Sequence, residues 1–202
     1  GDDAPTDVHP NNLYVDGSSR VNRTQFVPLA ATNMRNHRRE HANLCTAMEG
    51  VFEWIEESLR TNCPQEFEEI CIFAGVLPCN TNSPVYPFGG FVLNFNISTK
   101  IHRDHMDVRT GCGVLVIGVH KGGHLCLLEP GIVIGAWNGD FIFFLSRNIT
   151  HFNLHYSGKR ASIVFHTDID SSKWVEGRNG WDNNVYFCGT PGAHIVIRPL
   201  CT

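Results

Sequence analysis

Two histidines and an aspartate stand at spacings that suit a metal ion. His102 and Asp104 are separated by one residue, and His151 lies in a distant stretch of the chain. Because side chains alternate faces along a strand, a His-x-Asp pair presents its imidazole and its carboxylate on the same side. If His151 arrives from a second strand, the three form a two-histidine, one-carboxylate set. Such a set leaves positions open on the metal and is typical of non-haem Fe(II) oxygenases.

Arg160 follows His151 by nine residues and adds a group that can hold an acid. Its planar guanidinium matches a carboxylate through two parallel hydrogen bonds. A metal site accompanied by such an arginine predicts a dioxygenase that uses Fe(II), 2-oxoglutarate and O2.

A second His-x-Asp pair, His105 and Asp107, follows the first by three residues. We expect His102 and Asp104 to be the ligands, because an apolar run leads directly into Ile101 and His102. His105 and Asp107 lie further into the turn, and we expect them at the mouth of the site, either beside the metal ligands or facing a substrate.

Three stretches of this sequence match a known family. They are NFNISTKIHRDHMD, GGHLCLLEPG and NGDFIFFLSRNITHFNLHYSGKRASIVFHTD, within residues 88–168. Over this span the chain resembles the TET/JBP-like branch of 2-oxoglutarate dioxygenases, particularly the short versions from basidiomycete fungi. The resemblance implies a double-stranded β-helix (a jelly-roll, cupin-like barrel), Fe(II), 2-oxoglutarate, and oxidation of a methylated nucleobase in DNA, with RNA second.

The resemblance also implies a division of roles among the residues. Iron is expected on His102, Asp104 and His151. Arg160, helped by the hydroxyl of Ser162, is expected to anchor the carboxylate of 2-oxoglutarate that lies away from the metal.

The pattern around these residues predicts a mainly β domain with flanking helices, in the α+β class. Short apolar runs separated by glycine turns are typical of a β-sandwich or barrel. We expect strands at residues 91–98, 112–119, 124–130, 132–137, 140–146, 151–155 and 160–167. Asn138-Gly139 is a strong hairpin signal between two of them.

Two asparagines stand on one face of the strand expected at 91–98, because Asn94 and Asn96 are two residues apart. They either contact the cosubstrate or bond to nearby backbone. The strands at 151–155 and 160–167 form either a simple hairpin or parts of opposite sheets. In both arrangements His151, Arg160 and Ser162 point inward, and Asn153 joins them as a candidate substrate contact.

The residues before the strands predict helices. Apolar side chains recur at helical spacing from Asn33 to Arg60, and Pro64 is expected to open a second helix. Cys71 to Leu77 is expected to be a strand. We expect a single domain, with an N-terminal arm at 1–32, a helical layer at 33–76, a β core at 77–168 and a loop-like extension at 169–202.

Two features of the sequence could contact nucleic acid: a cluster of basic residues and a set of aromatic residues. The net charge is −4, so no overall basic field would attract DNA. Arg35, Arg38 and Arg39 form a local basic cluster, which is either a solvated helix face or a phosphate-contacting patch. Four aromatic residues in loop-like segments would either cap the barrel or stack on a base at its mouth: Tyr86, Phe88, Trp174 and Trp181.

The eight cysteines include no C-x-x-C pair and do not indicate a disulfide scaffold. With no signal-like or long apolar segment in the sequence, we expect an intracellular, nuclear monomer that does not enter membranes.

Three other readings stay open. A cupin-like Zn(II) or Ni(II) protein could use the same ligands without Arg160. A 2-oxoglutarate dioxygenase could act on a small molecule or a protein side chain. A β-sandwich that binds carbohydrate or protein would need no metal at all.

Overall fold

The computed structural model describes residues 28, 30–77 and 82–177, which adopt an α+β fold with antiparallel sheets. The helices in these residues are α1 (Thr32–Asn36), α2 (Arg38–Ala47), α3 (Glu49–Asn62), α4 (Pro64–Ala74) and α5 (Ser171–Gly177). Among these described helices, none combines the length and the apolar character that crossing a membrane requires.

Four strands form the main sheet, in the order β1-β9-β2-β6. Their bounds are Gly90–Phe95 for β1, Ala161–His166 for β9, Cys112–Ile117 for β2 and Phe141–Phe144 for β6. The small sheet has the order β5-β4-β7, from Ile132–Ile134, Leu125–Leu127 and His151–Asn153. Strands β3 (His120–Gly122) and β8 (Tyr156–Gly158) pair separately.

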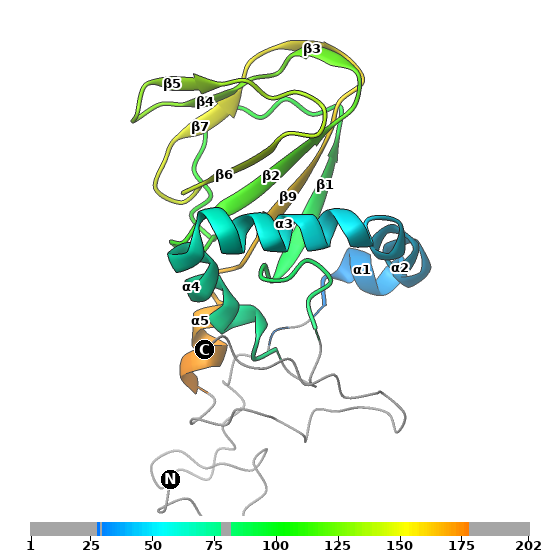
Figure 1. Ribbon diagram of the computed structural model, residues 1–202, viewed down its shortest axis with the longest axis vertical. Coiled ribbons are helices and arrows are strands. Elements are labelled where there is room, and N and C mark those ends of the chain that lie inside the picture. Colours follow the sequence, from blue (N-terminus) through cyan, green and yellow to red (C-terminus); the bar gives the residue numbers. More distant parts are fainter. Residues whose placement is uncertain (1–27, 29, 78–81, 178–202) are drawn as a thin grey trace, which may run out of the picture.

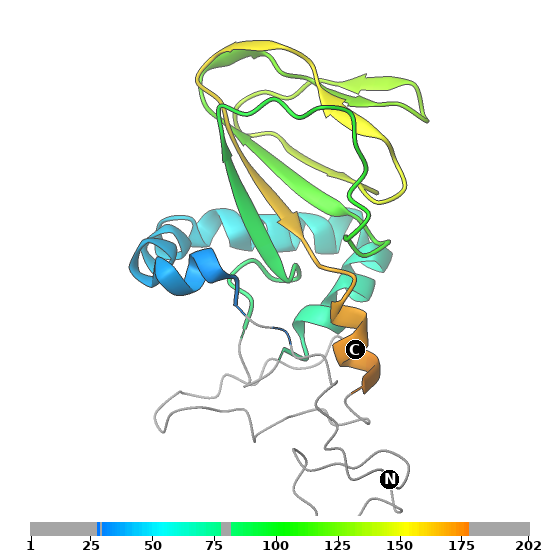
Figure 2. The same cartoon turned by 180° about the vertical axis from the view of Figure 1, so that it is seen from behind.

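Helix α3 lies across one face of the main sheet, and the long connection from β1 to β2 crosses in front of the other face (Figures 1 and 2). Phe52 of α3 packs edge-on against Phe165 of β9, with 5.8 Å between the ring centroids. Alternation along β9 therefore turns Ile163 and Phe165 toward the helices, where both are buried. The same alternation turns Ser162 and Val164 toward the opposite face.

The single helix expected from Asn33 to Arg60 is wrong, because the chain breaks helical geometry at His37 and again at Met48. Helices α1 and α2 contain no buried residue. Of these three helices, α3 is the one with buried residues, namely Phe52, Ile55 and Leu59. Packing therefore fixes the direction of α3 and leaves the two preceding helices free to turn away from it.

Two further expectations about local structure are wrong. Cys71 to Ala74 belong to α4, which begins with Pro64 in its first turn. The buried positions Ile70, Cys71 and Ala74 suit a helical spacing as well as an apolar strand. Residues 171–177, expected to be loop-like, form α5.

The connections between strands also differ from those expected. Asn138-Gly139 does form a turn, since Asp140 N–H donates to the Trp137 carbonyl at 3.1 Å. However, β5 pairs with β4 and β6 pairs with β2, so this turn carries the chain from one sheet to the other. Likewise β7 pairs with β4, whereas β9 pairs with β1 and β2. The simple hairpin between 151–155 and 160–167 is therefore absent, and these two strands lie in different sheets.

Candidate metal centre

A cavity of about 250 Å³ lies between the main sheet and the small sheet. Valines from three strands of the main sheet line one wall, namely Val92, Val114, Val116 and Val164. Leu125, His151 and Asn153 of the small sheet line the other. Side chains of a strand alternate between its two faces. In the main sheet, the residues next to these valines in the sequence therefore face the helices.

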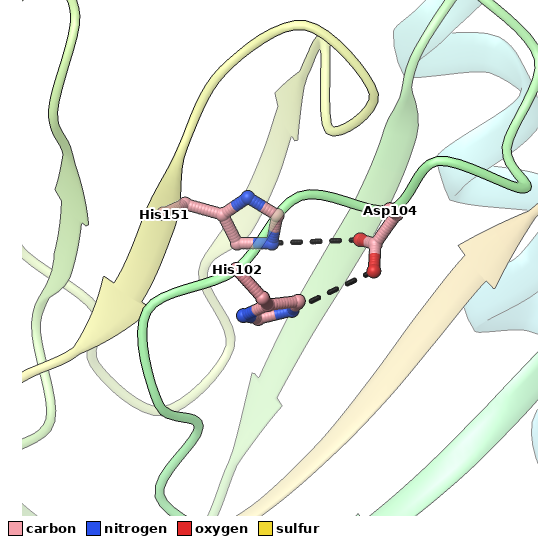
Figure 3. Close-up of side chains that lie close together, drawn as sticks. All are labelled: His102, Asp104 and His151. Atoms are coloured by element: carbon pink, nitrogen blue, oxygen red, sulfur yellow. Dashed lines mark ion pairs between the residues drawn. The ribbon is translucent and has the colours of Figure 1, made fainter.

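The three expected metal ligands meet at this cavity, although only one of them lies on a regular strand. His151 begins β7, whereas His102 and Asp104 lie on the connection between β1 and β2 (Figure 3). The Asp104 carboxylate stands between the imidazoles, 3.5 Å from Nε2 of His102 and 3.4 Å from Nε2 of His151. One ligand atom from each residue lies within 4.8 Å of the others.

Backbone hydrogen bonds hold the two segments in register at this point. The N–H of His102 donates to the carbonyl of His151 at 3.0 Å, and the N–H of His151 donates back at 2.9 Å. This single bridge replaces the strand that the sequence suggested for the His-x-Asp pair. It places the two imidazoles side by side, with ring centroids 4.2 Å apart.

The hydrogen bonds of the imidazoles leave Nε2 available for a cation. Nδ1 of His102 lies 2.6 Å from the Lys100 carbonyl, and Nδ1 of His151 lies 2.9 Å from the Ile149 carbonyl. A carbonyl only accepts, so Nδ1 carries the proton, and in a neutral ring the Nε2 lone pair faces Asp104. Two lone pairs around a carboxylate repel it unless a proton or a metal ion intervenes.

The pKa values of Asp104 and His151 reflect this contact. The hydrogen bond from His151 lowers the pKa of Asp104. Burial has the largest single effect and opposes charge on His151. The hydrogen bonds to Asp104 and to the Ile149 carbonyl, together with the nearby carboxylates, outweigh burial and raise the pKa of His151. The arrangement therefore selects for positive charge between these side chains, which a divalent metal would supply.

Arg160 lies immediately before β9, lines the cavity and is 5% exposed. Its Nε–H has no hydrogen-bond partner among residues 28, 30–77 and 82–177, and no carboxylate in that part of the chain lies within 4 Å. Burial lowers the pKa of Arg160, yet a guanidinium keeps its proton in proteins. An unpaired buried cation is costly, so this part of the cavity suits an anion.

Of the other expected cosubstrate contacts, Asn94 and Ser162 line the cavity and Asn96 does not. Ser162 lies opposite Asn94 in the pairing of β9 with β1. Strand β1 ends at Phe95, and Asn96 has a φ of 53°, so alternation no longer applies to it. Instead, Oδ1 of Asn96 accepts the N–H of Arg160 at 3.1 Å, and Asn96 positions the backbone of Arg160.

The two residues of the second His-x-Asp pair, His105 and Asp107, lie in different surroundings. Asp107 N–H donates to the Asp104 carbonyl at 2.9 Å, and this turn directs the Asp107 side chain into the protein, where it is 7% exposed. Asp107 lines the cavity wall and accepts a hydrogen bond of 2.6 Å from Ser146 Oγ. Burial raises the pKa of Asp107. His105 is exposed and does not line the cavity, so neither residue has the mouth position expected for it.

Asn153 lines the cavity with both polar atoms occupied. Its Oδ1 accepts from Thr99 Oγ1 at 2.7 Å, and its Nδ2 donates to the Gly123 carbonyl at 3.3 Å. Thr99 and His166 also line the cavity and were not expected from the sequence. His166 stands six residues after Arg160 on β9, so the even spacing along the strand could have identified it.

The residues expected to contact nucleic acid lie away from the cavity. Arg35, Arg38 and Arg39 are exposed on α1 and α2. Helix α2 reaches the sheet through His41, which stacks on Phe91 with 5.6 Å between centroids. Phe91 precedes the cavity residue Val92 and faces the other side of β1, so the basic cluster lies with the helices.

The aromatic residues are not a stacking surface either. Phe88 is 0% and Trp174 is 2% exposed. Nε1 of Trp174 donates to the Val76 carbonyl. Tyr86 packs against the core beneath the sheet. Trp181 lies outside the described residues.

No protein-family model and no curated protein matches this chain. Its fold does match solved structures. One is NgTET1 in complex with 5mC DNA, which aligns with a TM-score of 0.60 over 70% of this chain. The alignment spans 56% of the NgTET1 chain, so the present chain accounts for little more than half of that protein. At 14% sequence identity, the likeness establishes a TET-like, β-rich fold.

Proposed function

We propose that this chain is an Fe(II)- and 2-oxoglutarate-dependent dioxygenase built on a double-stranded β-helix. The observation that carries the proposal is one cavity with two unlike charged groups, the His-Asp-His cluster and the buried Arg160. A metal-binding protein of the cupin type gains nothing from a buried guanidinium. A binding module without metal gains nothing from a carboxylate between two imidazoles.

The donor set fits the group that this function requires. Two imidazole nitrogens and one carboxylate oxygen suit Fe(II) and leave positions open for other ligands. Bound iron and 2-oxoglutarate would supply the chemistry, in which O2 converts 2-oxoglutarate to succinate and CO2 and hydroxylates a substrate C–H bond.

The residues of the chain would bind, orient and exclude water. His102, Asp104 and His151 would hold the metal. The Arg160 fork would bind the distal carboxylate of 2-oxoglutarate, with the Ser162 hydroxyl beside it on the same face of β9. Val114, Val116 and Val164 form an apolar wall that would keep bulk water from the reacting atoms.

We propose a methylated nucleobase in DNA as the substrate, with RNA second. The sequence resemblance supports this choice, as does the likeness of fold to a protein that was solved with 5mC DNA. A base stacked in a duplex cannot enter a cavity between two sheets, so the target would be flipped out or single-stranded.

A second substrate class, a small molecule or a protein side chain, is favoured by two observations. The basic cluster of Arg35, Arg38 and Arg39 lies on the helical side of the sheet. The described aromatic residues that were candidates for base stacking are buried in the core or packed against it.

The test is succinate formation from 2-oxoglutarate with Fe(II), measured separately with methylated DNA, methylated RNA, peptides and free amino acids. We expect turnover that depends on Fe(II) and is increased by methylated DNA, with an oxidised base in the product. Turnover increased only by peptides or amino acids would favour the second class. No turnover with any of them would contradict the proposal.

A further inference from the structure

The two segments that carry the metal ligands meet at a second place, outside the cavity. Arg103 stands between His102 and Asp104, and Thr150 immediately precedes His151. Side chains of successive residues point in different directions, so Arg103 and Thr150 point away from the imidazoles and the Asp104 carboxylate. Both reach the same side chain, that of Glu129.

Glu129 accepts three hydrogen bonds from these two residues. Its Oε2 accepts the N–H of Thr150 at 2.6 Å, and its Oε1 accepts from Thr150 Oγ1 at 2.6 Å. Oε1 also accepts from Nη2 of Arg103. The network closes because Nε of Arg103 donates to Thr150 Oγ1 at 2.8 Å. We name Arg103, Glu129 and Thr150 the clamp.

The clamp joins a part of the chain that has no regular strand at the ligands. His102 and Asp104 lie on the connection from β1 to β2, which is bonded near the site through the bridge to His151 and the N–H of Asp104 to the Ser146 carbonyl at 3.2 Å. Three residues before His102, Thr99 also bonds to Asn153 of β7 through backbone and side chain, at 3.3 Å and 2.7 Å. Glu129 itself lies in the turn between β4 and β5, and β4 pairs with β7. A side chain rooted in the small sheet therefore fixes the ligand-bearing connection against the third ligand.

We propose that Glu129 is a positioning residue, which sets the spacing of the His102–Asp104 segment and His151 and thereby the affinity and geometry of the metal site. Glu129 touches no metal-binding atom and acts through its neighbours. The inference rests on the proposed function only in requiring that the cluster binds a divalent metal.

The charge of Glu129 is secure at physiological pH. The hydrogen bond from Thr150 is the largest of several that hold the pKa of Glu129 at about 2. The Glu129 and Arg103 side chains are 40% and 41% exposed, so salt will screen their attraction. An exposed ion pair alone contributes little to stability. The clamp should therefore be visible in metal binding more than in unfolding.

The experiment uses the whole chain, freed of metal with a chelator and titrated with Co(II), whose visible spectrum reports the arrangement of its ligands. We expect Glu129→Ala to weaken Co(II) binding by about tenfold or more, as outer partners of metal ligands commonly do. Its spectrum at saturating Co(II) should also differ from that of the wild type. Glu129→Gln keeps one acceptor oxygen and should lie between the two.

A matched control is Glu56→Gln, because Glu56 forms an exposed ion pair with Arg60 at 2.6 Å on helix α3, across the sheet from the cavity. It should leave the affinity and the spectrum unchanged. Arg103→Ala should weaken binding as Glu129→Ala does, and the double variant should be no weaker than either one. High salt should weaken wild-type binding toward that of Glu129→Ala.

Co(II) affinity of Glu129→Ala within twofold of the wild type, with the same spectrum, would overturn the clamp. If Glu129→Ala does not fold, Glu129→Gln decides by the same criteria. A wild-type chain that binds no Co(II) would defeat the proposed function as well, whereas equal binding by wild type and variant defeats the clamp alone.

Discussion

Replacing Arg160 with methionine should leave the ligand-free protein at least as stable as the wild type and remove its response to 2-oxoglutarate. Arg160 is 5% exposed and its Nε–H has no partner within the described ranges. Burying an unpaired ion costs several kcal/mol, and methionine removes that cost while filling most of the volume. The variant also loses the contact of the guanidinium with the Tyr156 ring, 5.8 Å from its centroid.

The magnitudes follow from these terms. A cation–π contact of this kind is worth about 0.5–1 kcal/mol. We therefore expect a net gain of about 1–3 kcal/mol in the free energy of unfolding, since replacing buried charges by apolar groups is often stabilising by such amounts. For a domain of this size that gain corresponds to a rise in Tm of roughly 2–12 °C.

Losing the guanidinium fork should change the free energy of cosubstrate binding more than it changes the free energy of unfolding. Each hydrogen bond to a charged group contributes about 1.5–3 kcal/mol, so losing two weakens binding by about 100-fold or more. At a 2-oxoglutarate concentration of about 100 times its Kd, the wild type gains about 2.7 kcal/mol of stability. A variant that binds about 100-fold more weakly gains about 0.4 kcal/mol under the same conditions.

Thermal unfolding with Mn(II) in place of Fe(II), with and without 2-oxoglutarate, measures both quantities without turnover. Arg160→Lys is the matched variant, because it keeps a positive charge but not the fork. It should show no gain in stability and an intermediate response to 2-oxoglutarate. An Arg160→Met chain destabilised by more than about 2 kcal/mol, or one with a full response to 2-oxoglutarate, would refute the reasoning.

Three further outcomes follow from the structure. His102→Ala should lose stoichiometric iron while His105→Ala, altered at an exposed position, keeps it; iron analysis giving the reverse would exchange their roles. Gly123→Ala should raise the 2-oxoglutarate requirement, because the added Cβ would lie 3.2 Å from Nε of Arg160. Gly131 has a similar positive φ but open space around it, so Gly131→Ala should cause the same backbone strain without a contact to Arg160. Equal effects of Gly123→Ala and Gly131→Ala on turnover would contradict a role for the contact with Arg160. The stability difference between wild type and Glu129→Gln should be full above pH 4.5 and vanish as pH falls toward about 2, because the folded pKa is depressed from 4.5 to about 2. Denaturant unfolding at several pH values would show a constant difference if the Glu129 carboxylate had no such stabilising bonds.

The strands could be predicted well from the sequence because their alternation is local. Strands β2 and β9 are short apolar, β-branched runs, and the alternation of side chains along any strand identifies which residues share a face. Arg160, Ser162 and His151 were placed inward by this rule, and all three line the cavity. His166 follows the same rule and was overlooked.

What could not be predicted depends on contacts between distant residues. The apolar run at 71–77 fits either a strand or the end of a helix, and the packing of α4 under the sheet decides for the helix. Asp107 turns inward because Ser146, nearly forty residues away, donates to its carboxylate at 2.6 Å. The clamp joins Arg103, Glu129 and Thr150 from three separate segments, and no spacing in the sequence relates them.

The charges of the cavity connect the two halves of the proposed site. Without ligands, contact with Asp104 helps to raise the pKa of His151, and Nε of Arg160 is buried without a hydrogen-bond partner in the described chain. A divalent metal and 2-oxoglutarate would bring two positive and two negative charges. Counting only Asp104 and Arg160 of the chain, the empty cavity and the cavity with both ligands are neutral, whereas either ligand alone would leave two unbalanced charges beside apolar walls. Desolvation then favours occupation of both halves together over occupation of either one alone.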